Sequence, residues 1–136
     1  MPKSFVNIWV HVIWTTKNRE PRLTKSIRFK LFRHMKEYAV RNKIDLDIIN
    51  GVEDHVHCLI RISSTQSISA IVSKLKGESS FWLTENGYKI NWQEGYGAFS
   101  IDHQSILGVR KYIYDQEQHH QERSYPEEIK ELTRIK

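Results

Sequence analysis

The order of strand-like and helical segments is the feature that most limits how this chain can fold. Segments rich in β-branched and aromatic residues alternate with segments whose apolar residues recur at helical spacing. The predicted order is strand, helix, strand, strand, helix, strand and then helix. This order is typical of the α+β ferredoxin-like (RRM-like) fold, an antiparallel sheet with helices on one face. We therefore expect that sheet, followed by a C-terminal helix that carries a tyrosine pair.

The predicted elements fill most of the 136 residues and leave no long linker or internal repeat. A chain of this length is sufficient for one domain with a substantial core and too short for two comfortable ones. We expect a single domain over residues 1–136. The predicted strands cover residues 5–15, 44–50, 54–62 and 96–101, the predicted helices cover residues 24–42, 67–85 and 104–120, and a short last helix begins near Pro126.

Charge and cysteine content narrow the possible partners and sites. The chain has 21 Lys and Arg against 16 Asp and Glu, a net charge of +5, which favours an anionic partner and nucleic acid above all. Cys58 is the only cysteine, so an internal disulfide and a thiolate zinc cluster within one chain are excluded. We expect it to be an inert core thiol. No apolar run approaches the length of a membrane span and no signal pattern is present, so we expect no membrane association and a cytoplasmic protein of a bacterial or archaeal cell.

Two histidines separated by one apolar residue carry the strongest chemical signal. Successive side chains of a strand point to opposite faces, so His55 and His57 share one face while Val56 and the apolar residues beyond it share the other. Two imidazoles on one face of a rigid strand are half of a divalent-metal site. A third ligand must come from another part of the fold.

The predicted helix over residues 104–120 offers that ligand together with a nucleophile. Tyr112 and Gln116 are four residues apart and share one face of a helix. If this helix lies against the histidine strand, Gln116 can offer its amide oxygen to the metal while Tyr112 lies over it. Arg110 and Lys111 next to Tyr112 suit a nucleophile that approaches phosphate. Tyr114 points nearly the opposite way and is the alternative nucleophile.

Two imidazoles and one amide oxygen leave open positions on the ion. An incompletely filled coordination sphere of this kind suits Mg²⁺ or Mn²⁺ acting on a phosphate, although histidines make zinc chemically possible too. In this arrangement the Tyr112 phenolate would attack a metal-polarised phosphodiester, expel a 3′-hydroxyl and form a covalent 5′-phosphotyrosine. Another 3′-hydroxyl could then reseal the strand without ATP.

Four sequence motifs in this order resemble a known family, the single-tyrosine HUH transposases of the insertion sequence 200/605 group (IS200-like transposases). The resemblance covers nearly the whole chain. Its motifs are His11–Arg19, Asp54–His57, Trp92–Ser100, and Tyr112–Gln116 followed by His119 and His120.

This resemblance implies a metal-dependent DNA transposase that cuts and joins single-stranded DNA at element ends. It implies that His55, His57 and Gln116 are the metal ligands and that Tyr112 is the nucleophile. Members recognise subterminal hairpins and work as homodimers, in which the tyrosine helix of one subunit often completes the partner's site.

Other interpretations of the same residues remain open. The chain could be a non-catalytic nucleic-acid-binding module of RRM-like fold, a domesticated host DNA-processing relative, or a metal hydrolase that uses water in place of tyrosine. Lys17 and Arg19 could meet DNA phosphate or form an ordinary solvated turn. His11 could approach the site if its strand lies next to the histidine strand, but we favour a structural histidine. We expect His119 and His120 to contact DNA or solvent rather than metal.

Overall fold

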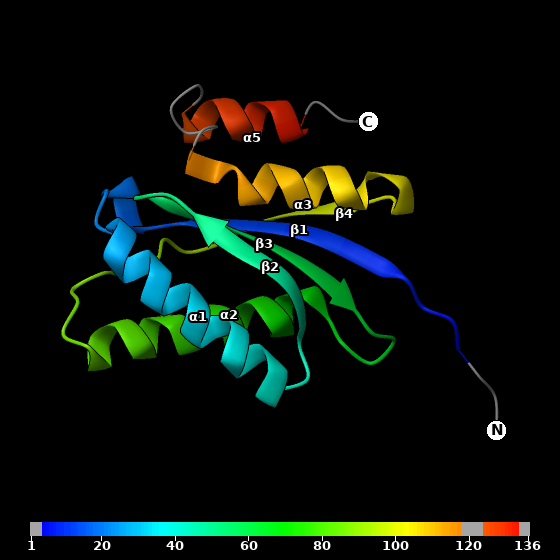
Figure 1. Cartoon of the computed structure of the whole chain (residues 1–136), viewed down its shortest axis with the longest axis horizontal. Helices are drawn as coiled ribbons and strands as arrows, with labels where there is room; N and C mark the ends of the chain where they lie inside the picture. Colours follow the sequence, from blue (N-terminus) through cyan, green and yellow to red (C-terminus); the bar gives the residue numbers. More distant parts are fainter. Residues whose placement is uncertain (1–3, 118–123, 134–136) are drawn as a thin grey trace.

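The protein is built on a four-stranded antiparallel sheet with the strand order β2-β3-β1-β4. The computed structural model describes residues 4–117 and 124–133. This strand order confirms the predicted ferredoxin-like fold. Helices lie on both faces of the sheet (Figure 1). The strands are β1 (Ile8–Thr15), β2 (Asp45–Gly51), β3 (His55–Ile62) and β4 (Gly97–Ile101).

Two long helices, α1 (Lys25–Arg41) and α2 (Ile68–Glu85), cover one face of the sheet (Figure 1). Each begins where the sequence predicts, because a hydroxyl side chain caps it. The Thr24 side chain accepts a hydrogen bond from the backbone N–H of Ile27, and the Ser67 side chain accepts one from Ala70. These caps satisfy N–H groups that a helix end would otherwise leave unpaired.

The main core lies between the sheet and these two helices. Strand β3 contributes alternate residues, Val56, Cys58 and Ile60, and all three are buried there. Burial raises the pKa of the Cys58 thiol, in agreement with the expected inert role. The other face of β3 carries His55 and His57, as the period of a strand requires.

The second face of the sheet carries a smaller apolar cluster. Helix α3 (Ile106–Tyr114) packs Ile106 and Ile113 against Leu59 of β3. Helix α5 (Tyr125–Thr133) lies beyond α3 on the same side (Figure 1). Its start agrees with the predicted helix near Pro126. This face therefore holds the histidines and both C-terminal helices.

The predicted continuous helix over residues 104–120 is wrong in its extent. A 3₁₀ turn over His103–Ser105 precedes α3, and Asp115 leaves the helical conformation with φ −93° and ψ 27°. The amide of Asn50 donates hydrogen bonds to the carbonyl oxygens of Ile113 and Tyr114 at 2.9 and 3.0 Å. The last carbonyl groups of a helix need hydrogen-bond partners from outside it. Asn50 of β2 supplies them to Ile113 and Tyr114, and α3 ends there. Helical conformation resumes at Gln116.

The first strand is also shorter than predicted. It begins at Ile8, which pairs with Ile62, the last residue of β3. Phe5 therefore lies beyond the paired register and is 93% exposed. In the described part of the chain, no helix is both long enough and apolar enough to cross a lipid bilayer.

Candidate active site

The turn between β2 and β3 fixes where the histidine strand begins. The backbone N–H of Val52 donates to the carbonyl oxygen of His55 at 3.0 Å. Gly51 lies so close to that carbonyl that a Cβ atom there would collide with it. The turn therefore depends on glycine at this position. It delivers His55 and His57 to the second face of the sheet, where both are fully buried.

His55 is held from both of its ring nitrogens. Its Nδ1 lies 2.6 Å from Oδ1 of Asp54, and its Nε2 lies 2.8 Å from Oε1 of Glu128. Burial lowers the pKa of His55, but the hydrogen bonds and negative charges of Asp54 and Glu128 outweigh it and raise the pKa above its ordinary value. The carboxylate of Asp54 fixes the ring orientation, as partners of metal-binding histidines commonly do.

His57 is oriented by a third histidine. Its Nδ1 lies 2.7 Å from Nε2 of His11, a buried residue of β1. Burial, and then the charge of His57, lower the pKa of His11 to about 3. His11 is therefore neutral at physiological pH. It is a bonded structural histidine as expected, and its partner is a residue of the site itself.

Glu128 on α5 is the residue that the sequence argument missed. Its carboxylate is fully buried and lies at the centre of the site. Oε2 lies 3.3 Å from Nε2 of His57, accepts a hydrogen bond from the Tyr112 hydroxyl and lies 3.5 Å from Nε2 of Gln116. Burial raises the pKa of Glu128, but the contacts with His55, His57 and Tyr112 hold it far below its usual range.

Tyr112 and Gln116 lie together at the site although α3 ends between them. The ring of Tyr112 lies 5.9 Å from the ring of His57. The amide of Gln116 is fully buried, and its Oε1 has no hydrogen-bond partner among the described residues. An unpaired buried oxygen is costly in a native fold unless a ligand satisfies it. Tyr114, in contrast, is 73% exposed.

These side chains form a donor set that a divalent cation can use. One ligating atom from each of His55, His57 and Glu128 lies within 4.8 Å of the others. The unpaired Oε1 of Gln116 adds an amide oxygen next to this group. Imidazole, carboxylate and amide donors suit Mn²⁺ and Mg²⁺, and also zinc. The residues present therefore fit a bound cation.

The four basic residues expected at DNA lie outside this buried group. Lys17 and Arg19 are exposed on a short 3₁₀ turn after β1. Arg110 is bonded to Asp47 of β2 at 2.6 Å, and Lys111 pairs with Asp115 at 2.7 Å. The Tyr112 hydroxyl donates a hydrogen bond to Glu128. His119 and His120 lie outside the described residues.

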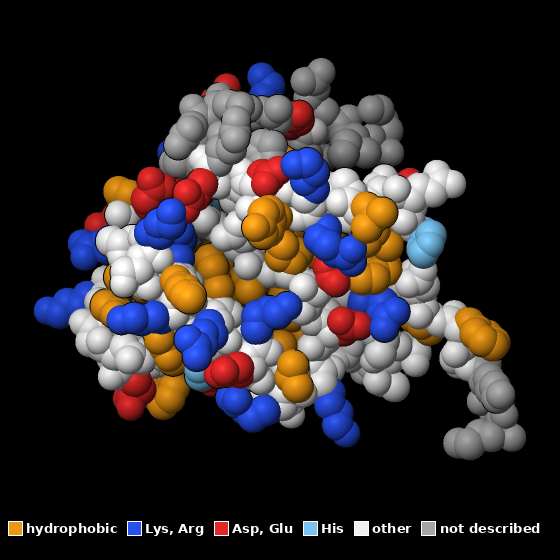
Figure 2. Space-filling view, viewed as in Figure 1, with side chains coloured by type: hydrophobic (Ala, Val, Ile, Leu, Met, Phe, Trp, Pro, Cys, Tyr) orange, Lys and Arg blue, Asp and Glu red, His pale blue; other side chains and the backbone are white. Residues whose placement is uncertain are grey.

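Basic side chains do not gather at one place on the visible face of the molecule. Figure 2 shows Lys and Arg side chains spread among acidic and apolar ones over this face. Surface charge therefore does not mark a path for DNA on this face.

The aromatic loop before β4 is in part a packing element. Trp92 contacts the main core, and its indole N–H donates to the Ser79 hydroxyl at 2.9 Å.

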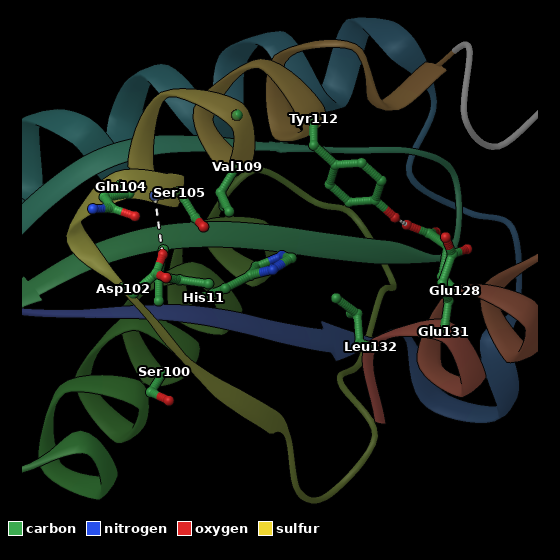
Figure 3. Close-up of a pocket in the computed structure, with 12 residues that line it drawn as sticks. His11, Ser100, Asp102, Gln104, Ser105, Val109, Tyr112, Glu128, Glu131 and Leu132 are labelled. Carbon is green, nitrogen blue, oxygen red and sulfur yellow. Dashed lines mark hydrogen bonds between the residues drawn. The ribbon is translucent and has the colours of Figure 1, made fainter. Parts of the chain in front are cut away.

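A cavity of about 650 Å³ opens onto the site between β4, α3 and α5. Figure 3 shows the Tyr112 ring pointing toward Glu128, with His11 facing the same space from β1. Polar side chains line its other end, among them Asp102 and Gln104. A substrate in this cavity would reach the Tyr112 hydroxyl.

Comparison with known proteins gives a consistent result. The family model described as "Transposase IS200 like" matches residues 4–116. The ISDra2 transposase TnpA of Deinococcus radiodurans is 27% identical over 114 residues, which are 78% of this chain and 81% of that protein.

Two solved structures share the fold. A crystal structure of a candidate transposase from Deinococcus radiodurans R1 superposes with a TM-score of 0.68 at 22% identity, covering 85% of this chain and 98% of that one. A REP-associated tyrosine transposase bound to a REP hairpin superposes with a TM-score of 0.62 at 16% identity, covering 85% of this chain and 70% of that one.

Proposed function

Because the chain belongs to the IS200-like transposase family and is a DNA transposase, we propose that it cleaves and rejoins single-stranded DNA at insertion-element ends, with Tyr112 as the nucleophile. Residues 1–136 form one catalytic domain in this proposal. The observation that carries it is the placement of the Tyr112 hydroxyl at the buried group of His55 and His57, on Glu128. A nucleophile and a cation-binding group thus meet at one cavity.

The proposed reaction is an exchange of one phosphodiester for another. The phenolic oxygen of Tyr112 attacks phosphorus, the bond to the 3′-oxygen breaks, and the 3′-hydroxyl leaves with a proton. The 5′ end stays bound to Tyr112 as a phosphotyrosine. In the second step a 3′-hydroxyl attacks this ester, and the phenol of Tyr112 leaves. Each step breaks one P–O bond and forms another, so no ATP is needed.

His55, His57 and Gln116 are the proposed ligands of a divalent metal, Mg²⁺ or Mn²⁺. When bound, the ion supplies Lewis-acid polarisation of the phosphate and lowers the barrier to attack by a phenol. The chain's own groups do the positioning. Asp54 and His11 fix the two imidazole rings, and the hydrogen bond to Glu128 directs the Tyr112 hydroxyl into the site.

The proposed substrate is single-stranded DNA that carries a subterminal hairpin. The net charge of +5 supports a nucleic-acid partner, and one structural neighbour is described as bound to a hairpin. Lys17 and Arg19 are the proposed phosphate contacts outside the cavity, because both are exposed on the turn after β1 and the positive charge of Arg19 lies near Tyr125 of α5. Arg110 and Lys111 are proposed as further contacts, although each already pairs with a carboxylate.

We also propose a homodimer. Tyr112 and both histidines meet within one chain here, so a tyrosine acting on its own subunit's histidines needs no exchange of α3. Exchange of that helix between subunits is the alternative. Mixing a Tyr112→Phe subunit with a His57→Ala subunit separates the two arrangements, because activity recovers in the mixture only if the tyrosine acts on the partner's site.

The test is a denaturation-resistant protein–DNA adduct. The protein is incubated with hairpin-bearing single-stranded DNA and Mn²⁺, and the product is analysed by denaturing electrophoresis and mass spectrometry. We expect an adduct at Tyr112, its loss in Tyr112→Phe, and its retention in the matched control Tyr114→Phe, whose ring is exposed. An adduct that persists in Tyr112→Phe removes this residue from its role, and cleavage without any adduct favours a water nucleophile.

A further inference from the structure

We propose that Glu128 is a fourth protein ligand of the divalent metal, so that the site is completed by helix α5. This proposal rests on the metal-dependent function proposed above and adds a ligand to it. Glu128 lies beyond residues 4–116, the part of the chain that the family model covers. The metal site of this chain therefore includes a residue from outside the matched region.

The first argument is the geometry of the carboxylate. Its two oxygens face the two ligating imidazoles, Oε1 at 2.8 Å from Nε2 of His55 and Oε2 at 3.3 Å from Nε2 of His57. Oε2 also lies 3.5 Å from the amide nitrogen of Gln116. The carboxylate thus occupies the point on which the proposed metal ligands converge. A cation held by the imidazoles would have this carboxylate in reach.

The second argument is the balance of charge. A fully buried carboxylate is stable only when a positive charge or strong hydrogen bonds compensate it. Among the described residues the side chains that contact Glu128 are two imidazoles, a phenol and an amide, with no Lys or Arg. The two imidazoles can bind either Glu128 or a metal, and the Gln116 amide can bind a metal through its oxygen, whereas the phenol is the proposed nucleophile. A divalent cation shared by His55, His57 and Gln116 compensates the carboxylate and also satisfies the unpaired Oε1 of Gln116.

The third argument is that local structure aims Glu128 at the site. The backbone N–H and the hydroxyl of Ser124 both donate to Glu127 Oε1, at 2.9 and 3.1 Å, so the Glu127 side chain caps the start of α5. Pro126 follows in the first turn, where proline favours a helix. The ring of Tyr125 lies 5.1 Å from the ring of His55. The start of α5 is therefore fixed by its cap and by the contact between Tyr125 and His55, which is a proposed metal ligand.

The experiment is a calorimetric titration of the DNA-free 136-residue chain with Mn²⁺. We expect Glu128→Gln to bind Mn²⁺ at least about tenfold more weakly than the wild type, the low end of what loss of even an outer-shell partner costs a metal site. Glu127→Gln is the matched control, because it makes the same charge change one residue away and glutamine can keep the capping contact. Its affinity should equal that of the wild type.

A second variant covers the case that Glu128→Gln does not fold. Glu128→Asp keeps the buried charge but withdraws the carboxylate by one methylene, and we expect an intermediate affinity. Thermal unfolding with and without Mn²⁺ shows that each variant is folded, and the stabilisation by Mn²⁺ should shrink in the same order. Wild-type affinity in a folded Glu128→Gln or Glu128→Asp variant would overturn the proposal.

Tighter metal binding or faster cleavage in Glu128→Gln would also overturn the ligand proposal, because Glu128 would then obstruct the site.

The Tyr112→Phe variant separates this proposal from the proposed function. It should lose the DNA adduct yet bind Mn²⁺ like the wild type, since the phenol is not one of the proposed ligands. If the adduct experiment fails while the Glu128 variants weaken Mn²⁺ binding as expected, the ligand assignment stands and the nucleophile assignment falls.

Discussion

Replacing Asp54 with asparagine is expected to weaken binding of the divalent metal while leaving the fold intact. Asp54 is not in the donor group of His55, His57 and Glu128. It acts through the hydrogen bond between its Oδ1 and Nδ1 of His55, which directs Nε2 of that ring into the site. Asparagine can present its amide N–H₂ to the same nitrogen and favour the wrong tautomer. The backbone bond from Thr16 to the Asp54 carbonyl, at 2.9 Å, does not depend on the side chain.

The expected loss of metal affinity in Asp54→Asn follows from the burial and length of the hydrogen bond between Asp54 and His55. Loss of an outer-shell partner of a ligating imidazole typically costs about 10- to 100-fold in metal affinity, which is about 1.4–2.7 kcal/mol. The bond is short, 2.6 Å, and the side chains of His55 and Asp54 are 0% and 15% exposed. Water can therefore do little to replace it. We expect a loss in the upper half of that range.

The assay is calorimetric titration of wild type and Asp54→Asn with Mn²⁺ in the absence of DNA. Glu53→Gln is the control, because it makes the same carboxylate-to-amide change at the neighbouring position, whose side chain is not in the donor group of His55, His57 and Glu128. Circular dichroism verifies that both variants are folded. Equal Mn²⁺ affinity in Asp54→Asn and wild type would refute the argument that Asp54 sets the orientation and tautomer of His55.

Two further predictions concern stability. In metal-free buffer the contribution of His11 to the free energy of unfolding should fall as pH drops below 6.5, because the unfolded chain protonates His11 there while the folded chain keeps it neutral down to about pH 3. The raised pKa of His55 acts in the opposite sense in both proteins, so the measured quantity is the free energy of unfolding of the wild type minus that of His11→Gln. This difference should decrease as pH falls in urea titrations, and a difference that does not change with pH would contradict the prediction. Leu59→Ala should cost about 2–5 kcal/mol in urea unfolding, because it opens a cavity under α3. Leu107→Ala, at a side chain that is 74% exposed, should change stability by no more than about 0.5 kcal/mol.

Sequence reasoning predicts well the elements whose signals are local. Thr24 and Ser67 mark the starts of α1 and α2 because a cap acts within three residues. The alternation along β3 places His55 and His57 on one face because the period of a strand is fixed by the backbone. These predictions are confirmed. Their success needs no knowledge of distant parts of the chain.

The parts that sequence reasoning missed depend on distant contacts. Asn50 ends α3 from 63 and 64 residues away, and nothing near Tyr114 signals it. Glu128 reaches His55 across 73 residues. A faint signal for Glu128 exists in the sequence, because it shares a helix face with Tyr125 and Leu132 and so lies on the less polar side of α5. The roles of Tyr112 and Gln116 stay predictions until the adduct and metal experiments are done.

The unequal size of the two cores bears on how the site responds to change. The main core between the sheet, α1 and α2 contains most of the buried apolar residues, whereas α3 is held to the sheet by a cluster around Leu59, Ile106 and Ile113. A helix with few buried contacts opens at a lower free energy than the domain as a whole. Since α3 carries Tyr112 and packs beside α5, loss of contacts in this cluster should disturb the tyrosine and Glu128 before it unfolds the histidine strand. Leu59→Ala should therefore raise hydrogen exchange first in α3, and a uniform rise over the whole sheet would show that the two layers unfold together.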